Sequence, residues 1–348
     1  MQACHTRTYP DTPDKRAERG EIIDMQYYPA PEEVIEMSDL ISAVESAFLD
    51  HGAGRSIMPP KVYVNLPGGD FRTMPSYIPS LETAGVKIVN VHPENRKAGL
   101  PTVMAVTILL DPPTGTPVAV LNATTLTDLR TGACAAVATR ALAHKTSGTL
   151  GIIGSGRQAE SGLLALSQVF EPEEVLVWSR SASHADEFVQ RNSHLPIRST
   201  DIESAAGADV LLTVTPSKTP LIHDAWIADG AHINAMGADA PGKQELDPAI
   251  LKRADVFVDD MDQAVHSGEV NVPISLGLYS PSEITGTLGR VLTGAIPKPS
   301  PGTVTVFDST GLSITDLAAA RLAIGKGRTI DLPFMQNAAT PGIIGVRE

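Results

Sequence analysis

The glycine-rich stretch Gly154-Ser155-Gly156-Arg157-Gln158-Ala159 constrains the fold of this 348-residue chain more than any other feature. It follows a short apolar run at residues 149–154 and opens a segment with helical spacing at residues 158–169. In such a strand–turn–helix unit, the first glycine permits the tight turn and the second lets the backbone approach a pyrophosphate. The small third residue allows close helix packing, and the helix N-terminus supplies amide donors. The stretch therefore predicts a dinucleotide site at Gly154 and Gly156.

Apolar strands alternate with helical segments after residue 147. Further strands are expected at residues 174–179, 208–215, 231–237, 254–260 and 303–308. Continuous apolar strands separated by helices are typical of a parallel sheet that is covered on both faces. We therefore predict an α/β protein whose residues 147–312 form a Rossmann domain with a doubly wound parallel sheet.

The chain before residue 147 predicts a second, α+β domain. Residues 38–50 have apolar side chains at helical spacing, with Ser38 or Asp39 as the N-cap. Two β-rich runs at 101–111 and 116–123 are joined by a Pro/Gly turn, which indicates a hairpin, and an Ala-rich helix follows. We expect residues 21–146, rejoined by 313–348, to form this domain, and the polar residues 1–20 to be a disordered extension.

Composition narrows the class of partner. Lys and Arg total 27 against 40 Asp and Glu, for a net charge of −13, which argues against nucleic-acid binding. No apolar run approaches 18 residues, so we expect no membrane span. Two cysteines cannot build a disulfide framework, and the nine histidines show no metal-binding spacing. We predict a cytoplasmic protein without a metal site.

The end of the second predicted Rossmann strand bears on the choice between NAD and NADP. NAD enzymes usually place Asp or Glu there, where it binds the ribose 2′-hydroxyl. This chain has Ser179-Arg180-Ser181 instead. The planar, cationic fork of an arginine suits a 2′-phosphate, although an ordinary surface arginine would look the same. We therefore predict NAD(P), with NADP(H) favoured over NAD(H).

Residues 55–97 reverse the overall charge balance, with six cations against three anions. Several separated cations outside the nucleotide domain suit a substrate that carries a carboxylate. Lys87 interrupts an apolar run, and a desolvated lysine with a lowered pKa can act as an acid or base near neutrality. Asp239 and Asp308 end predicted strands, where parallel sheets bind ligands, but either could equally cap a helix.

Many ordered segments between about Ile22 and Ile324 resemble the ornithine cyclodeaminase/μ-crystallin family, and within it the archaeal alanine dehydrogenases most. The matching segments are Met58-Pro59-Pro60-Lys61-Val62-Tyr63, Gly69-Asp70-Phe71-Arg72-Thr73-Met74-Pro75, Ala84-Gly85-Val86-Lys87, Leu129-Arg130-Thr131-Gly132-Ala133, His232-Ile233-Asn234-Ala235-Met236-Gly237-Ala238-Asp239, Pro241-Gly242-Lys243-Gln244-Glu245-Leu246-Asp247, Gly268-Glu269-Val270-Asn271-Val272 and Phe307-Asp308-Ser309-Thr310-Gly311-Leu312.

The resemblance implies a Rossmann domain and a substrate-binding domain whose β-structure makes a homodimer. It also implies that nicotinamide oxidises an α-amino acid to the imine, or the reverse. By that resemblance Lys87 is the acid/base and Asp239 lies beside the reacting amine. The implied substrate-binding cations are Lys61, Arg72 and Arg130. The implied cofactor-binding set is Arg130, Gly154, Gly156, Arg157, Gln158, Ser179, Arg180, Ser181, Met236, Gly237, Ala238, Asp239 and Ser309.

One departure from the archaeal pattern concerns the cofactor. That pattern has an acidic residue at the end of the second strand, where this chain has Ser179 before Arg180. The ketimine-reducing μ-crystallins, which prefer NADP(H), have a polar residue and an arginine there. The cofactor residues thus follow a different branch of the family from the substrate-side motifs, which leaves the physiological direction open.

The sequence predicts an NAD(P)-dependent L-amino-acid dehydrogenase that interconverts L-alanine with pyruvate and ammonia. One alternative is an ornithine cyclodeaminase that makes L-proline, which needs an acid for the distal ammonium; Asp70 is the only acidic residue between 55 and 81. A ketimine or Δ1-pyrroline-2-carboxylate reductase is a second, which Arg180 favours. A non-catalytic, crystallin-like nucleotide binder is a third, against which the presence of Lys87, Arg130 and Asp239 argues.

Overall fold

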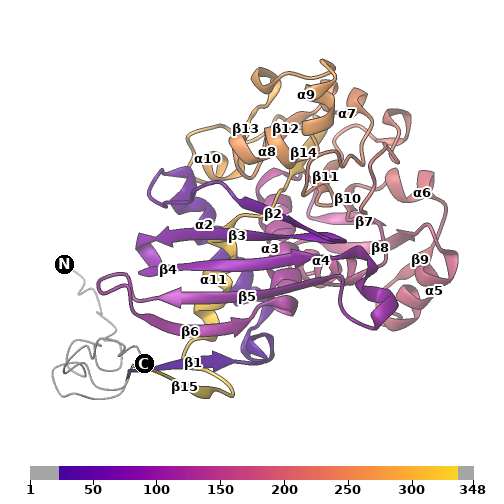
Figure 1. Cartoon of the computed structure of the whole chain (residues 1–348). Coiled ribbons are helices and arrows are strands. Elements are labelled where there is room, and N and C mark those ends of the chain that lie inside the picture. The colour runs from indigo at the N-terminus through magenta and orange to yellow at the C-terminus, as the bar shows by residue number, and fades with distance from the viewer. Residues whose placement is uncertain (1–22, 336–348) are drawn as a thin grey trace, which may run out of the picture.

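Two β-sheets with helices packed around them make up the protein, as the computed structural model of residues 23–335 shows (Figure 1). The predicted extension at residues 1–20 lies outside the described residues. The first sheet has the strand order β15-β1-β6-β5-β4-β3-β2. Its strands are β1 (Ile23–Tyr28), β2 (Val62–Leu66), β3 (Gly69–Ile78), β4 (Thr83–Val91), β5 (Val103–Leu110), β6 (Pro117–Asn122) and β15 (Ile330–Met335).

The first sheet is mostly antiparallel, and it contains the predicted hairpin of β5 and β6. Alternate side chains of β3 and β4 are buried on one face, where α2 (Met37–Gly52) and α11 (Ser313–Ala323) pack with α3 (Thr124–Leu142). The C-terminal strand β15 returns to this sheet and pairs with β1. The first sheet is therefore built from two separate parts of the chain, residues 23–122 and the C-terminal strand at 330–335.

The cap of α2 differs from the prediction. The N-cap is Glu36 rather than Ser38 or Asp39, and its side chain makes no capping hydrogen bond. The first helical hydrogen bond runs from the Leu40 amide to the Glu36 carbonyl at 3.0 Å, so the two predicted caps already lie inside the helix. The buried face of Leu40, Ile41, Val44 and Phe48 stabilises the helix without a side-chain cap.

The second sheet is parallel throughout, in the order β13-β12-β14-β11-β10-β7-β8-β9. This confirms the predicted Rossmann sheet beside an α+β portion. Its strands are β7 (Ser147–Ile153), β8 (Glu171–Trp178), β9 (Ile197–Ser199), β10 (Val210–Thr213), β11 (His232–Ala235), β12 (Asp255–Val258), β13 (Gly286–Thr287) and β14 (Thr305–Asp308).

Short helices connect the parallel strands. They are α4 (Arg157–Leu166), α5 (Ala182–Arg191), α6 (Ile202–Ala206), α7 (Pro248–Arg253), α8 (Met261–Ser267), α9 (Asn271–Ser275) and α10 (Leu288–Leu292), and five 3-10 turns occupy Pro31–Val34, Pro79–Leu81, Pro93–Ala98, Asp224–Trp226 and Pro281–Glu283. The strand order reverses between β7 and β10, and α4 begins just after β7. Open parallel sheets bind ligands at this point, outside the carboxyl ends of the strands.

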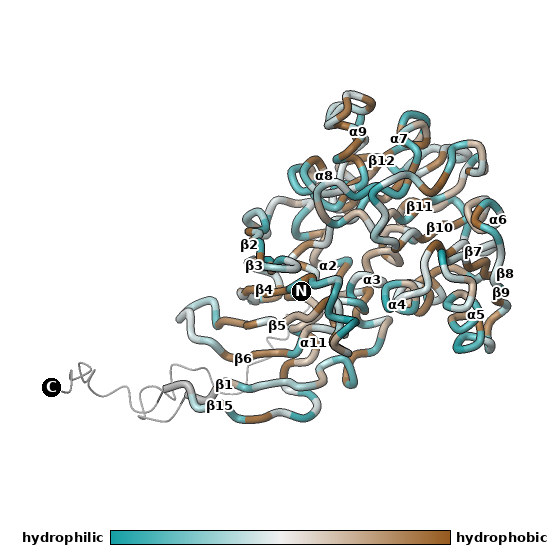
Figure 2. The backbone as a smooth tube through the Cα atoms, turned by 45° about the vertical axis from the view of Figure 1, so that its right-hand side comes forward, coloured by the Kyte–Doolittle hydropathy of each residue, from teal (hydrophilic) through white to brown (hydrophobic). Residues whose placement is uncertain are grey.

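Hydropathy follows the two sheets. The most hydrophobic stretches of the backbone run along strands of both sheets, whereas the outer helix α5 is mostly hydrophilic (Figure 2). Within residues 23–335, no helix is long and apolar enough to cross a membrane.

Helix α3 joins the two halves. It packs against α4 of the half that contains the parallel second sheet, called the nucleotide half from here on, and against α2 and α11 of the half that contains the first sheet. Small residues permit this, because a Cβ added at Gly132 would lie 2.2 Å from the carbonyl oxygen of Ser161 on α4. The packing therefore fixes the part of α3 that carries Arg130, two residues earlier, against α4.

Candidate active site

Lys87 lies on the buried face of β4 and is 1 % exposed. Its Nζ donates to Oδ1 of Asp316 at 2.8 Å, and Nε of Arg130 donates to the same oxygen at 2.8 Å. Burial lowers the pKa of Lys87 to about 8; the nearby Arg130 adds to this effect, while Asp316 opposes it. The structure thus brings Lys87 and Arg130 together, with a lysine that changes charge near neutral pH.

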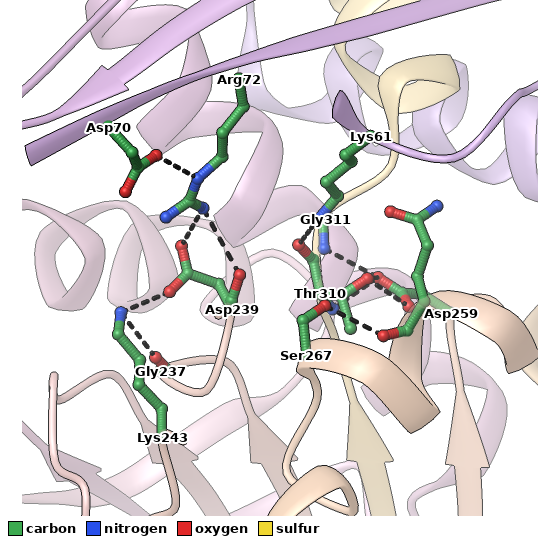
Figure 3. Close-up of polar contacts among 11 residues, drawn as sticks. Lys61, Asp70, Arg72, Gly237, Asp239, Lys243, Asp259, Ser267, Thr310 and Gly311 are labelled. Carbon is green, nitrogen blue, oxygen red and sulfur yellow. Dashed lines mark hydrogen bonds and ion pairs between the residues drawn. The ribbon is translucent and has the colours of Figure 1, made fainter. Parts of the chain in front are cut away.

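Arg72 projects from β3 toward the nucleotide half, as Figure 3 shows. Its Nε donates to Oδ1 of Asp70 at 2.9 Å, and one terminal nitrogen donates to Oδ2 of Asp239 at 3.2 Å. The guanidinium also lies 5.0 Å from the ring centroid of Tyr63. Arg72 therefore connects the first sheet with the loop that follows β11.

Asp239 accepts hydrogen bonds from two cations. Lys243 contacts its Oδ1 and Arg72 its Oδ2. Burial raises the pKa of Asp239, but Lys243 and Arg72 outweigh burial and hold this pKa below its ordinary value. The carboxylate is therefore ionised throughout the neutral range, at the carboxyl edge of the parallel sheet.

Lys61 comes from the segment before β2 and donates from Nζ to the Thr310 carbonyl at 2.5 Å. Burial lowers its pKa to about 8, against the attraction of Asp259 and Asp239. The fully buried carboxylate of Asp259 accepts from the amides of Thr310 (2.7 Å) and Gly311 (2.8 Å) and from the Ser309 hydroxyl (3.2 Å). Asp259 therefore holds the turn after β14 that meets Lys61 (Figure 3).

The glycine-rich turn has the backbone that a dinucleotide requires. Gly154 has a φ of 124°, a region that favours glycine, and its amide donates to the Trp178 carbonyl at 2.8 Å. A Cβ added at Gly156 would meet nothing within 4 Å, so open space faces this turn at the N-terminus of α4. These residues fit a bound pyrophosphate.

Arg157 and Gln158 open α4 and both turn toward Asp128 on α3. Arg157 Nε donates to its Oδ2 at 2.5 Å, and Gln158 Nε2 donates to its Oδ1 at 2.7 Å. The buried Oε1 of Gln158 has no hydrogen-bond partner within residues 23–335. One acceptor beside the turn is therefore left for a donor from outside the chain.

The end of β8 borders a pocket of about 220 Å³, which is lined by Trp178, Ser179, Ala182, Ala185, Ser199, Thr200 and Asp201. Ser179 Oγ accepts from Ser155 Oγ at 3.0 Å, which connects the pocket to the glycine-rich turn. Ser181 bonds Ser183, while Arg180 is exposed and has no ion-pair partner among residues 23–335. The predicted residues for the adenosine end of a cofactor thus cluster here.

The segment Met236-Gly237-Ala238 follows β11 and is held by hydrogen bonds to buried carboxylates. The amide of Gly237 donates to Oε2 of the buried Glu245 at 2.9 Å, and the Thr213 hydroxyl donates to the same oxygen at 2.8 Å. Glu269 in turn accepts from the amides of Glu245 and Leu246. Two buried carboxylates thereby fix the loop that carries Asp239.

Within residues 23–335, no group of three or more His, Cys, Asp and Glu side chains is placed to hold a metal ion. The charged residues of the site pair with one another instead.

The model of the ornithine cyclodeaminase/mu-crystallin family matches residues 24–327. This chain belongs to that family. A relative named alanine dehydrogenase, from Archaeoglobus fulgidus, is 45% identical over 294 residues, which cover 84% of this chain and 91% of the relative. A relative named Δ1-pyrroline-2-carboxylate reductase, from Bacillus cereus, is 32% identical over 305 residues, which cover 84% and 93%. A solved archaeal alanine dehydrogenase dimer with bound NAD superposes with a TM-score of 0.85 at 42% identity, covering 88% of this chain and 99% of that one.

Three acidic residues of this family member escaped the sequence reasoning: Asp316, Asp259 and Glu245. Asp316 is the one carboxylate in the otherwise apolar and Ala-rich stretch of α11, a signal that could have been noticed. Asp259 fell inside the strand expected at residues 254–260, and Glu245 inside a matching segment. Asp316 lies 229 residues from its partner Lys87 in the sequence.

Proposed function

We propose that this protein is a nicotinamide-dependent L-amino-acid dehydrogenase whose preferred pair is L-alanine and pyruvate. The observation that carries the proposal is the pair of cations, Arg72 on β3 and Lys61 before β2, that lies near Asp239 at the carboxyl edge of the parallel sheet. Oxidation or reduction at an amino-acid C–N bond is the chemistry that the names of the relatives share.

The cofactor is a nicotinamide dinucleotide, held by the turn at Gly154 and Gly156 and by Ser179, Arg180 and Ser181 at the end of β8. When bound, the cofactor would supply the acceptor for a hydride from the substrate Cα. The structure named above with NAD supports a dinucleotide of this kind. The exposed Arg180, which forms no ion pair among residues 23–335, favours NADP(H) over NAD(H).

Arg72, Lys61 and Arg130 hold the substrate carboxylate and so orient Cα for transfer. Lys87, neutral above about pH 8, takes a proton from the substrate ammonium and releases it to solvent. It then takes a second proton from the water that attacks the iminium and passes that proton to the leaving nitrogen. Asp239 stabilises the cationic iminium, since its two cations keep it ionised. The sum of these steps converts alanine and water into pyruvate, ammonia and a proton, with one hydride removed.

The rival cyclodeaminase function is disfavoured by the state of Asp70. That reaction needs an acid for the distal ammonium of ornithine, and Asp70 already accepts from Arg72 Nε at 2.9 Å. Asp70 is therefore already paired within the chain, and no second acidic residue lies between 55 and 81. The reductase function differs in its substrate, a cyclic imine whose C=N bond is reduced without hydrolysis, and the same cations would bind the carboxylate of either substrate.

The homodimer is part of the same proposal. The first sheet exposes apolar side chains along β2, where Val62, Tyr63, Val64 and Leu66 are all more than a third exposed. An apolar surface of this kind commonly marks an interface. The dimer named for the solved archaeal relative supports it.

A substrate panel tests the function. Absorbance at 340 nm is followed with NAD and NADP against alanine, ornithine, proline and cyclic ketimines. We expect reduced cofactor to accumulate with alanine. Proline formation from ornithine without accumulation would establish a cyclodeaminase, and activity confined to cyclic ketimines would establish a reductase.

A further inference from the structure

Asp316 is a buried carboxylate to which the proposed reaction assigns no role. It lies on α11 and is 3 % exposed, and one of its oxygens, Oδ1, accepts from both Lys87 and Arg130 at 2.8 Å. These cations come from β4 and α3, and Figure 1 shows α11 behind the strands of the first sheet. Three elements that are distant in sequence therefore meet at one atom.

The helix that carries Asp316 is firmly placed. Ile314 and Leu317 are fully buried, and the Ser313 hydroxyl donates to the Pro75 carbonyl of β3 at 3.0 Å. Because α11 is fixed to the sheet on both sides of Asp316, the carboxylate has little freedom to move. Its position determines where the two cations sit.

Among the charged groups around Lys87, Asp316 is the one that most favours the protonated form of the lysine. Arg130 on α3 and Lys61 before β2 both disfavour the charged form, and Asp316 on α11 favours it; Asp128 on α3 also lies within electrostatic reach. Removal of the Asp316 charge would leave two buried cations facing each other.

Two acceptors beside Lys87 have unused capacity. Oδ2 of Asp316 and Oγ1 of Thr107 are buried and have no hydrogen-bond partner within the described residues. Thr107 on β5 is the residue directly paired with Lys87 in the sheet. An ammonium has three N–H donors, and the described residues show a partner for one of them, so these two oxygens can accept hydrogen bonds from Lys87 when it is protonated.

We propose that Asp316 is a positioning residue for the reaction: its carboxylate holds the amine of Lys87 and the guanidinium of Arg130 in a fixed relation and stabilises Lys87 when it is protonated. The inference rests on the proposed function, in which Lys87 is the acid/base group. It assigns no contact between Asp316 and the substrate.

The test is the pH profile of kcat/KM for alanine oxidation in D316N. Without the carboxylate the Lys87 ammonium is less stable, so the acid limb should move down by about one pH unit or more. The plateau should fall roughly tenfold to hundredfold, because Arg130 loses its anchor. An acid limb at the wild-type position in folded, active D316N would overturn the inference.

D50N is the matched control, because Asp50 is equally buried and pairs with Arg55 and Ser80, away from Lys87. It should leave the acid limb where it is. If D316N does not fold, the double variant D316N/K87M should recover folded protein, since it removes the uncompensated ammonium; equal loss in both overturns the inference. The proposed function fails separately, when K87A retains full activity.

Discussion

Arg72 and Asp239 stand on opposite halves of the molecule and meet at 3.2 Å, between one terminal nitrogen and Oδ2. Arg72 belongs to β3 of the first sheet, and Asp239 to the loop after β11 of the parallel sheet. In the proposed function the first binds the substrate carboxylate and the second the substrate nitrogen. The substrate carboxylate must therefore compete with Asp239 for Arg72.

This competition predicts an unusual effect of D239N. Propionate, which has the carboxylate but no amine, should inhibit D239N about tenfold more strongly than wild type, because a competing charge-assisted pair is gone. Turnover of alanine should fall at least tenfold in the same variant. Inhibition constants against alanine measure the first effect. D229N, whose carboxylate is almost fully exposed, serves as the control, and weaker propionate binding in D239N would contradict the competition.

The lowered pKa of Lys87 predicts the pH dependence of alanine oxidation. The lysine must be neutral to accept a proton, so kcat/KM should rise with pH up to about 8. K87A should lose this inflection and about 100-fold or more in turnover. Initial rates at 340 nm from pH 6 to 10 measure both.

Lys61 is the control for that assignment, since burial also lowers its pKa to about 8. K61M should raise the KM for alanine but keep the inflection. An inflection that disappears in K61M and persists in K87A would reverse the roles of the two lysines.

The sequence around the glycine-rich turn was enough to predict the parallel-sheet half. The active site was predicted only in part, because several of its contacts join residues that are far apart in the sequence. The turn at Gly154 and Gly156 needs only its neighbouring strand and helix, so its residues identify it directly. Lys87 stood out because a cation interrupts an apolar run. Asp316 did not, since a lone acid on a helix is ordinary until the chain folds and β4 brings Lys87 against it.

Burial, rather than residue type, explains what else was missed. Asp259 looked like any strand-end acid, and only the fold shows that it receives the amides of Thr310 and Gly311. The predicted cap of α2 was wrong because it was chosen by residue type alone. Ser38 has the chemistry of a cap, but apolar packing starts the helix one residue before it.

The preference for NADP(H) depends on Arg180. R180A should raise the KM for NADP roughly tenfold to hundredfold while that for NAD changes less than twofold, because only NADP carries the 2′-phosphate. R198A is the control, since Arg198 is exposed in the same half but pairs with Glu174. Equal effects on both cofactors would remove Arg180 from the choice between them.

The contact between α3 and α4 predicts the effect of G132A. An alanine inside a helix normally stabilises it by about 1 kcal/mol, yet here the added Cβ would lie 2.2 Å from the Ser161 carbonyl oxygen. The two helices must move apart, and we expect a net loss of about 2 kcal/mol in the free energy of unfolding by urea. The displacement of α4 should also raise the KM for the cofactor, because α4 begins at the glycine-rich turn.

The control is G207A. At Gly207 an added Cβ meets only ordinary contacts of 3.5 Å or more, so G207A should be close to neutral in both measurements. Unchanged stability in G132A would show that the helices are not held at this distance.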